Sequence, residues 1–352
     1  MARPALTITL LVLGLTVFGL LMVGSSSVVD AARDFSDKWY YLKLQSGWAF
    51  MGLAGFFLVS RFDYHKLEKP SVTLLLVTLL LLVLVLIPGL GSKLLGARRW
   101  LNLGFFSFQP AELAKLTLTI YFSSLLKKTS RFWPFIFILG LVGFLIMMEP
   151  DLGTTLILTG TSLLTYFGSG GKLRYLVLMI PMFVMLLGGL ILLSPYRLNR
   201  LKTFFDYSRD PLGSSYHIRQ VLLSLGSGGV FGVGLGQSKQ KYEFLPEATT
   251  DSIFAVIGEE LGLVGGLAVI LAFLVFMSQG FSVIRSASDQ FGANLGLAIT
   301  SWISLQALVN LGAMVAIIPL TGVPLPFISY GGSSLVLVLL ASGILVNISR
   351  QS

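Results

Sequence analysis

Residues 242–262 read YEFLPEATTDSIFAVIGEELG, a stretch that leads from a polar loop into a long apolar segment. Asp251 stands at the junction, and Glu259 and Glu260 follow inside the apolar run. A carboxylate at the edge of a bilayer costs free energy, so its position needs a physical reason. Three reasons are open at this point: a helix cap, a proton path or catalysis.

The composition around this stretch is that of a membrane protein. Of the 352 residues, 55% are hydrophobic and 12% are charged, whereas soluble domains carry about 25% charged residues. Several apolar runs exceed the roughly 20 residues that cross a bilayer. The absence of cysteine excludes disulfides and thiolate sites, and two distant histidines, His65 and His217, disfavour a multi-histidine metal centre. We therefore expect an all-α polytopic membrane protein forming a single domain over residues 1–352.

Apolar periodicity predicts about ten transmembrane helices. They cover residues 5–24, 44–60, 71–88, 110–126, 132–148, 152–169, 174–193, 252–278, 292–318 and 328–348. The first is interpreted as an uncleaved signal-anchor. Placing both termini in the cytoplasm leaves eleven Lys and Arg residues inside and five in the short outer loops, so the N-in/C-in orientation is favoured. The net charge of +9 is then assigned to topology and anionic lipid rather than to nucleic acid.

Two segments between these spans are more than short connectors. Residues 89–109 carry Arg98 and Trp100 and are predicted to be re-entrant or interfacial. Residues 194–251 form a large extracytoplasmic loop between the seventh and eighth spans, and loops of this length are usually functional. Within it, residues 197–205 (RLNRLKTFF) alternate basic and apolar residues as an interfacial amphipathic helix does.

Asp251 has a structural interpretation and a functional one. As an N-cap it would contribute about 1 kcal/mol to the stability of the helix. Against it, Thr249, Thr250 or Ser252 would cap the helix without placing a charge at the membrane face. On an ideal helix Glu259 lies about 80° around the axis from Asp251 and roughly 12 Å deeper, so the two can share a cavity.

Other acids and bases flank the predicted spans. Glu112 and Lys115 have the i, i+3 spacing of a pair on one helix face, either a structural ion pair or part of a polar cavity. Asp151, in the turn of residues 149–154 (EPDLGT), is better explained as the N-cap of the next span.

A glycine run in the long loop raises the question of anion binding. Residues 226–236 read GSGGVFGVGLG and lack the Gly-Lys-Ser/Thr ending of a P-loop, so nucleotide binding is weakly supported. Their backbone amides can still form an anion nest, and Lys239 and Lys241 follow directly. The prolines of residues 319–326 predict a tight turn, after which Ser329 and Tyr330 either pack closely or bind sugar hydroxyls.

Taken together, these stretches resemble the SEDS family (shape, elongation, division and sporulation), which contains RodA and FtsW. The resemblance runs almost end to end and rests on residues 97–102 (ARRWLN), 109–115 (QPAELAK), 149–154, 210–213 (DPLG), 226–236, 245–262 and 328–334 (ISYGGSS). One departure is Ser252, where the family usually has phenylalanine. The turn of residues 319–324 (PLTGVP) leans towards the RodA branch.

The resemblance implies a peptidoglycan glycosyltransferase that polymerises lipid II at the outer face of the cytoplasmic membrane. It also implies a class B penicillin-binding protein as transpeptidase partner, and the family's essential aspartate falls on Asp251. In this hypothesis Asp251 is the general base on a sugar hydroxyl. A divalent cation such as Mg²⁺ is a further candidate for offsetting the charge of the leaving diphosphate. The predicted substrate-binding residues are Arg98, Trp100, Glu112, Lys115, Lys239, Lys241, Glu259, Ser329 and Tyr330.

Two rival functions remain open from the sequence. A lipid flippase or transporter would use Glu112, Lys115, Glu259 and Glu260 as a polar transit path, since intramembrane charges often mark such paths. A non-enzymatic scaffold of a cell-wall synthase would need no chemistry at Asp251. The composition excludes neither.

Overall fold

The computed structural model describes residues 3–94, 97–102, 104, 107–127, 131–192, 195–206, 210, 213, 215–242 and 244–352. Pro211 and Leu212 of the 210–213 motif lie outside these residues. The helices are α1 (Arg3–Ser26), α2 (Val28–Phe35), α3 (Tyr40–Val59), the 3₁₀ turn η1 (Tyr64–Leu67), α4 (Ser71–Leu86), α5 (Pro110–Leu125), α6 (Phe132–Met148), α7 (Leu152–Gly168), α8 (Leu173–Leu192), α9 (Pro195–Phe205), α10 (Tyr216–Ser227), α11 (Ile253–Ser286), α12 (Gln290–Met314) and α13 (Gly332–Gln351).

Each of the ten predicted spans coincides with a helix, namely α1, α3 to α8 and α11 to α13. Within the described ranges, five of these helices are long and apolar enough to cross a membrane: α1, α3, α11, α12 and α13. Two more, α4 and α6, are apolar but shorter. The polytopic α-helical membrane fold is therefore confirmed. The predicted amphipathic helix at 197–205 is also a helix, α9.

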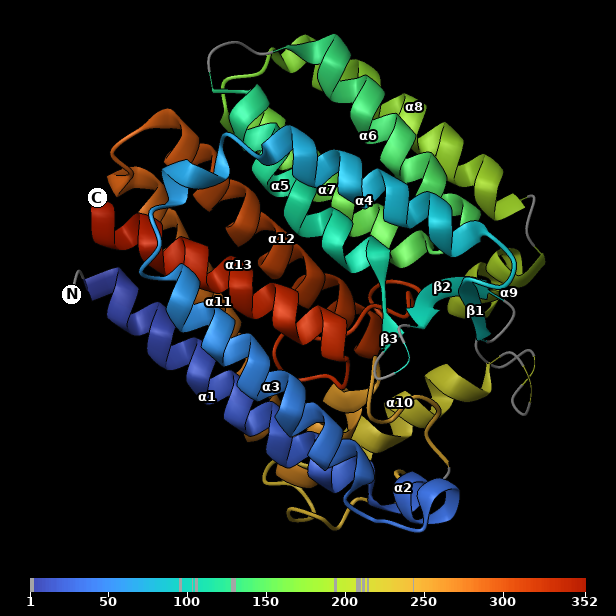
Figure 1. Cartoon of the computed structure of the whole chain (residues 1–352). Helices are drawn as coiled ribbons and strands as arrows, with labels where there is room; N and C mark the ends of the chain where they lie inside the picture. Colours follow the sequence, from blue (N-terminus) through green and yellow to red (C-terminus); the bar gives the residue numbers. More distant parts are fainter. Residues whose placement is uncertain are drawn as a thin grey trace.

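The helices form two packed groups that α12 joins (Figure 1). In one group α1, α3, α11 and α13 lie against one another, and in the other α4, α5, α6 and α7 do so. Helix α12 packs against α11 and α13 on one side and against α5 and α7 on the other. Trp302 of α12 is fully buried between the groups. The side chains of Asn294, Thr300, Gln306 and Asn310 of α12 are likewise buried inside the molecule.

Residues 89–109, which the sequence predicts to be re-entrant or interfacial, include strands in the structure. They contain a three-stranded antiparallel sheet, β1 (Gly91–Leu94), β2 (Ala97–Asn102) and β3 (Ser107–Phe108), in the order β1-β2-β3. Ser92 pairs with Trp100, and a register shift follows Ser92. Leu103, Phe105 and Phe106 lie outside the described residues. A hairpin lets the backbone N–H and C=O groups of so short a segment bond each other, which a lone extended strand cannot do.

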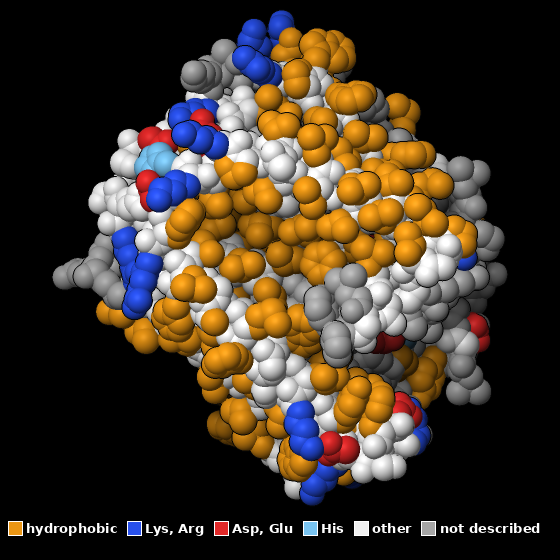
Figure 2. Space-filling view, viewed as in Figure 1, with side chains coloured by type: hydrophobic (Ala, Val, Ile, Leu, Met, Phe, Trp, Pro, Cys, Tyr) orange, Lys and Arg blue, Asp and Glu red, His pale blue; other side chains and the backbone are white. Residues whose placement is uncertain are grey.

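The two ends of the bundle differ in content. The chain termini lie side by side at one end, whereas the sheet, α2, α9 and α10 gather at the opposite end (Figure 1). We call this second end, where Asp251 precedes α11, the Asp251 end. Between the two ends, hydrophobic side chains form a broad belt, and charged side chains collect at its borders (Figure 2). Exposed apolar residues such as Phe50, Leu58 and Phe137 are what a lipid-facing surface requires.

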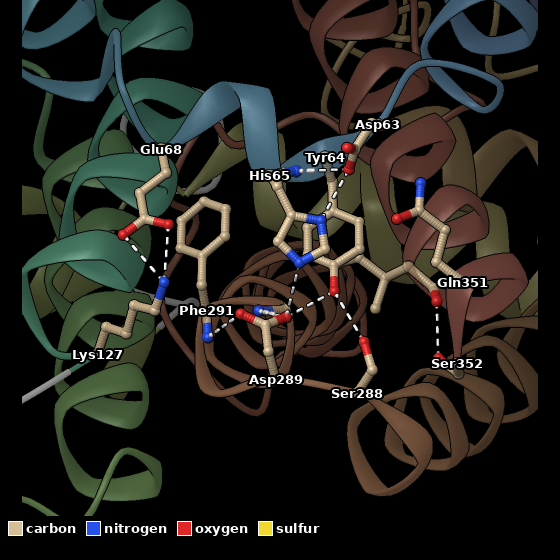
Figure 3. Close-up of polar contacts among 12 residues, drawn as sticks. Asp63, Tyr64, His65, Glu68, Lys127, Ser288, Asp289, Phe291, Gln351 and Ser352 are labelled. Atoms are coloured by element: carbon tan, nitrogen blue, oxygen red, sulfur yellow. Dashed lines mark hydrogen bonds and ion pairs between the residues drawn. The ribbon is translucent and has the colours of Figure 1, made fainter.

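At the terminus end, a polar network ties loops from both helix groups together (Figure 3). Tyr64 donates its hydroxyl to Asp289 Oδ1 at 2.6 Å. Asp289 in turn caps α12 by accepting the backbone N–H of Phe291 and Gly292. Lys127 pairs with Glu68 at 2.9 Å. This network closes the end of the bundle that lies away from Asp251.

Candidate active site at the Asp251 end

Asp251 is a buried carboxylate at the start of α11, with 7% of its surface exposed. The helix begins at Ile253 and its N-cap residue is Ser252, whose side chain makes no capping bond. The prediction that Asp251 caps this helix is therefore wrong, because the chain reaches helical geometry two residues later. Thr250 Oγ1 lies 3.3 Å from Asp251 Oδ1. The carboxylate thus lies beside the start of the helix but does not cap it.

The backbone before α11 is held by three successive hydrogen bonds. The carbonyl oxygens of residues 249–251 accept, in order, the backbone N–H of Tyr330 at 2.8 Å, the hydroxyl of Ser329 at 2.6 Å and the amide Nδ2 of Asn310 at 2.8 Å. Asn310 also donates to the Val323 carbonyl at 2.8 Å. Ser329 and Tyr330, predicted to bind substrate, therefore hold the backbone of the two residues that precede Asp251.

Burial governs the charge state of Asp251. Desolvation, with the neighbouring charge of Glu247 as a second cause, raises the pKa of the Asp251 carboxyl to about 6. The Arg200 guanidinium opposes this rise. At neutral pH the carboxyl is therefore mostly ionised yet basic enough to accept a proton, which is the condition that a general base meets.

Part of the glycine run packs against α11 through its backbone. A side chain at Gly232, whose φ is +82°, would overlap the carbonyl oxygen of Glu260. Helix α11 is kinked at Gly262, with φ +66° and ψ −164°. The kink releases helix carbonyls, and the N–H groups of Val233 and Gly234 bond those of Glu259 and Glu260 at 3.0 Å each. These amides are occupied, so the predicted nest is not formed by them.

Glu259 lies on the loop side of α11 and does not contact Asp251. Its Oε2 accepts hydroxyl bonds from Ser224 of α10 at 3.0 Å and from Ser238 at 2.6 Å. Its Oε1 accepts the backbone N–H of Lys239 at 2.8 Å. The expected cavity shared by Glu259 and Asp251 is replaced by a loop anchor, because the loop folds back onto this helix face.

Lys241 and Glu260 form a buried ion pair, with 2.9 Å between Nζ and Oε1. Ser25 of α1 donates its hydroxyl to both oxygens of Glu260, at 2.8 and 2.9 Å. Lys241 is thus directed into the protein, whereas the Lys239 side chain is exposed. Of the two loop lysines predicted to bind substrate, Lys241 therefore stabilises the fold through its ion pair.

Glu112 and Lys115 also form a buried pair, with 2.7 Å between Nζ and Oε1. Lys115 additionally donates to Gln306 Oε1 at 2.9 Å and lies over the ring of Trp302 at 5.3 Å. Gln306 reaches the Pro324 carbonyl at 3.0 Å. The pair therefore belongs to a polar chain that leads through α12 to the turn beside Asp251.

Arg98 and Trp100 lie on β2, both partly buried. Their neighbour Arg99 anchors the sheet by donating to the carbonyls of Glu149 at 2.9 Å and Pro150 at 2.6 Å. Asp151 accepts the Thr154 N–H at 3.0 Å, so its predicted role as N-cap of α7 is confirmed. Burial raises the pKa of Glu149, which lies two residues before Asp151, to about 9.

The comparisons with known proteins decide the family. The family model described as "Cell cycle protein", whose label names FtsW, RodA and SpoVE, matches residues 5–352. The chain belongs to the SEDS family. It is 40% identical to Stage V sporulation protein E of Bacillus subtilis, over 99% of this chain and 98% of that protein. It is also 40% identical to the probable peptidoglycan glycosyltransferase FtsW of Geobacter metallireducens, over 99% and 95%.

Solved structures agree with this SEDS assignment. A chain of a peptidoglycan synthase complex that coordinates polymerization and crosslinking superposes with a TM-score of 0.82 at 27% identity, covering 98% of this chain and 97% of that one. RodA of Thermus thermophilus gives 0.71 at 27% identity, covering 98% and 96%. The lean towards the RodA branch stays a prediction, and the higher identity to SpoVE and FtsW gives it no support.

Three residues of this SEDS protein near Asp251 were not among the predicted site residues. They are Arg200 of α9, His217 of α10 and Asn310 of α12. Asn310 had a usable signal, since a lone amide in an apolar span needs a buried partner. The described residues contain no group of three or more His, Asp or Glu side chains placed to hold a metal. No chemical step is therefore assigned to Mg²⁺.

Proposed function

We propose that this protein is a peptidoglycan glycosyltransferase that polymerises lipid II at the outer face of a bacterial cytoplasmic membrane. The observation that carries the proposal is Asp251, a buried carboxyl of pKa about 6 in a segment, residues 249–251, whose three backbone carbonyls each accept a hydrogen bond. Relatives at 40% identity over nearly their whole length bear the name of this activity.

The proposed topology places this site outside the cell. Ten helices cross the membrane, both termini are cytoplasmic, and residues 194–251 form an extracytoplasmic loop that includes α9 and α10. The hydrophobic belt between the two ends of the molecule supports the proposal that these ends lie on opposite sides of the membrane (Figure 2). The Asp251 end then lies where a lipid-anchored sugar sits, since its polyprenyl chain stays in the bilayer.

The reaction proceeds by direct displacement. A carboxylate oxygen of Asp251 takes the proton of the acceptor sugar hydroxyl, whose oxygen forms a bond to the anomeric carbon of the donor. The bond from that carbon to the diphosphate breaks, and the electron pair leaves with the polyprenyl diphosphate. Cationic groups at the site stabilise the charge that develops on the leaving group. No covalent enzyme intermediate is needed.

A transpeptidase partner follows from the product. Uncrosslinked glycan strands need crosslinking, and a structural relative of this chain belongs to a complex that coordinates polymerization and crosslinking. We therefore propose a class B penicillin-binding protein as the partner. The flippase alternative is less well supported, because Glu112 and Glu260 are held in separate ion pairs and Glu259 in a loop anchor.

The test uses the purified protein, with and without its transpeptidase partner, and lipid II in detergent. We expect glycan polymer from the wild type and none from Asp251→Asn. Polymer formation by Asp251→Asn at the wild-type rate would contradict the role of Asp251. Transbilayer movement of lipid II in liposomes without any polymer would contradict the proposed function and favour the flippase.

A further inference from the structure

Residues 230–235 (VFGVGL), which follow α10, leave large apolar side chains on the surface of the predicted extracytoplasmic loop. We call this segment the apolar loop. Phe231 is 82% exposed, and Val230, Val233 and Leu235 are exposed as well. The sequence around them, residues 220–238, contains no Asp, Glu, Lys or Arg. A contiguous apolar patch of this kind on a protein surface indicates that something apolar covers it.

The backbone of the apolar loop is bonded to α11 at the kink of that helix, Gly262. The N–H of Leu263 donates to the Gly229 carbonyl at 2.9 Å. The N–H of Val264 donates to the Val230 carbonyl at 3.1 Å. The loop therefore lies directly beside the first residues that follow the kink.

From this point onward α11 has the surface of a lipid-facing helix. It is one of the helices long and apolar enough to cross a membrane. Leu263, Val264, Leu267 and Leu271 are 47–58% exposed, and their spacing places them on one side of the helix. Because the loop is bonded to the first two of these residues, its exposed side chains extend this surface beyond the kink.

We propose that the apolar loop is a membrane anchor whose side chains insert among the acyl chains of the outer leaflet. The anchor is separate from glycosyl transfer and requires only the proposed topology, in which the Asp251 end is extracytoplasmic. Residues 230–235 then form a shallow re-entrant turn within a loop that is otherwise in water.

The polar contacts next to the apolar loop are made inside the protein. The Gly236 carbonyl accepts a hydrogen bond from Lys241 Nζ at 2.7 Å, and the buried Ser238 donates its hydroxyl to Glu259 at 2.6 Å. The large apolar side chains of the loop are left on the surface. A loop surrounded by water would show the reverse arrangement, with apolar side chains inside and charged ones outside. Contact with lipid makes the observed arrangement favourable.

The backbone at the centre of the apolar loop also suits insertion. Irregular backbone is tolerated at membrane depth only where its polar groups are bonded within the protein or reach water. The N–H groups of Val233 and Gly234 bond α11 carbonyls at 3.0 Å each, and the N–H of Gly232 bonds the Gly228 carbonyl at 2.8 Å. Three successive N–H groups are thus bonded inside the protein, which lowers the cost of placing this turn against the acyl chains.

Spin labels on single cysteines test the anchor, because the natural chain has no cysteine that would compete for the label. Phe231→Cys and Leu235→Cys report on the apolar loop. Leu267→Cys is the lipid reference on α11, and Ser352→Cys is the aqueous reference, exposed at the C-terminus. Each labelled protein is placed in nanodiscs of phosphatidylethanolamine and phosphatidylglycerol. Spin relaxation by oxygen and by a water-soluble nickel chelate is then measured.

We expect the oxygen-to-nickel accessibility ratio of both loop labels to exceed that of the Ser352 label at least about fivefold, because hydrocarbon excludes the polar chelate. The ratio should lie close to that of the Leu267 label. Loop labels that match the Ser352 label overturn the anchor. Loop labels that reach the chelate until the transpeptidase partner is added also overturn it, since the surface then belongs to a protein interface.

A second measurement uses the wild-type protein and is therefore independent of the folding of any variant. The same nanodiscs carry a phospholipid with a photoreactive carbene precursor on its acyl chain, and the labelled peptides are mapped after illumination. Labels on residues 230–235 support the anchor, whereas labels confined to the transmembrane helices overturn it. Neither measurement involves lipid II, so its result does not depend on whether the protein forms polymer.

Discussion

Lys241 and Glu260 form an ion pair 2.9 Å long in which both side chains are almost completely buried. The pair fastens the loop after α10 to α11 and, through Ser25, to α1. Glu260→Gln would leave the Lys241 ammonium buried without its counter-charge. We expect a loss of about 3–5 kcal/mol of folding free energy, measured as a fall in the thermal unfolding temperature in detergent.

The double variant Lys241→Met/Glu260→Met serves as the control. Replacing both members of a buried pair by apolar side chains is often close to neutral, so most of the lost stability should return, together with polymerisation. A double variant that is folded but inactive would show that Lys241 acts on substrate.

The glycine run offers a separate test of close packing. Gly232 and Gly236 both have positive φ, +82° and +79°, but only Gly232 has a carbonyl where a Cβ would lie. Gly236→Ala should cost about 1–2 kcal/mol for its left-handed backbone. Gly232→Ala should cost a further 1–3 kcal/mol, because the chain must move away from Glu260. Equal unfolding temperatures for the two variants would contradict the packing of this run on α11.

Ser329 is expected to affect turnover through the position of Asp251. Ser329→Ala removes the donor to the Thr250 carbonyl and the acceptor of the Leu325 N–H. Small displacements of a catalytic group lower rates strongly, so we expect kcat to fall about tenfold or more while KM changes little. Ser342→Ala is the control, since that hydroxyl bonds Val338 within its own helix. A raised KM at unchanged kcat would instead indicate that Ser329 binds the sugar.

Asp251→Asn should be at least as stable as the wild type at pH 8. The folded-state pKa of about 6 exceeds the ordinary value of 3.8, so the folded protein binds this proton more tightly than the unfolded chain. The ionised carboxylate therefore destabilises the fold above pH 6, by at most about 3 kcal/mol. This destabilisation disappears as the pH falls towards 4. Unfolding temperatures of both proteins at pH 8 and pH 5 test the sign, and a stability loss at pH 8 would contradict it.

The parts of this structure that could be predicted are those determined by residues close together in the sequence. Long apolar runs located α1, α11 and α13, and the Asp151 cap followed from the residues next to it. The sheet at 91–108 was missed because strand pairing depends on contacts that no periodicity records.

The partners of the buried charges could not be predicted from neighbouring residues in the sequence either. Lys241 was predicted to bind substrate. Its partner Glu260 lies 19 residues further along the chain, so the sequence did not show that the two side chains meet. Asn310 lies 59 residues from the carbonyl it holds, and Arg200 reaches the site only because α9 folds back onto the turn after α12. Asp251 could be proposed as the base from the sequence, whereas the residues that surround it could be identified only from the tertiary structure.

The most direct test of the account is the pH dependence of kcat/KM for lipid II polymerisation between pH 5 and pH 8.5. His217, with a pKa of about 4, stays neutral within this range, whereas the pKa of Asp251, about 6, lies inside it. We predict that activity rises with pH through about 6, as Asp251 loses its proton, and is constant above about pH 7. Activity that is already constant from pH 5 upward, or an Asp251→Asn variant that keeps the wild-type profile, would contradict the assignment of Asp251 as general base.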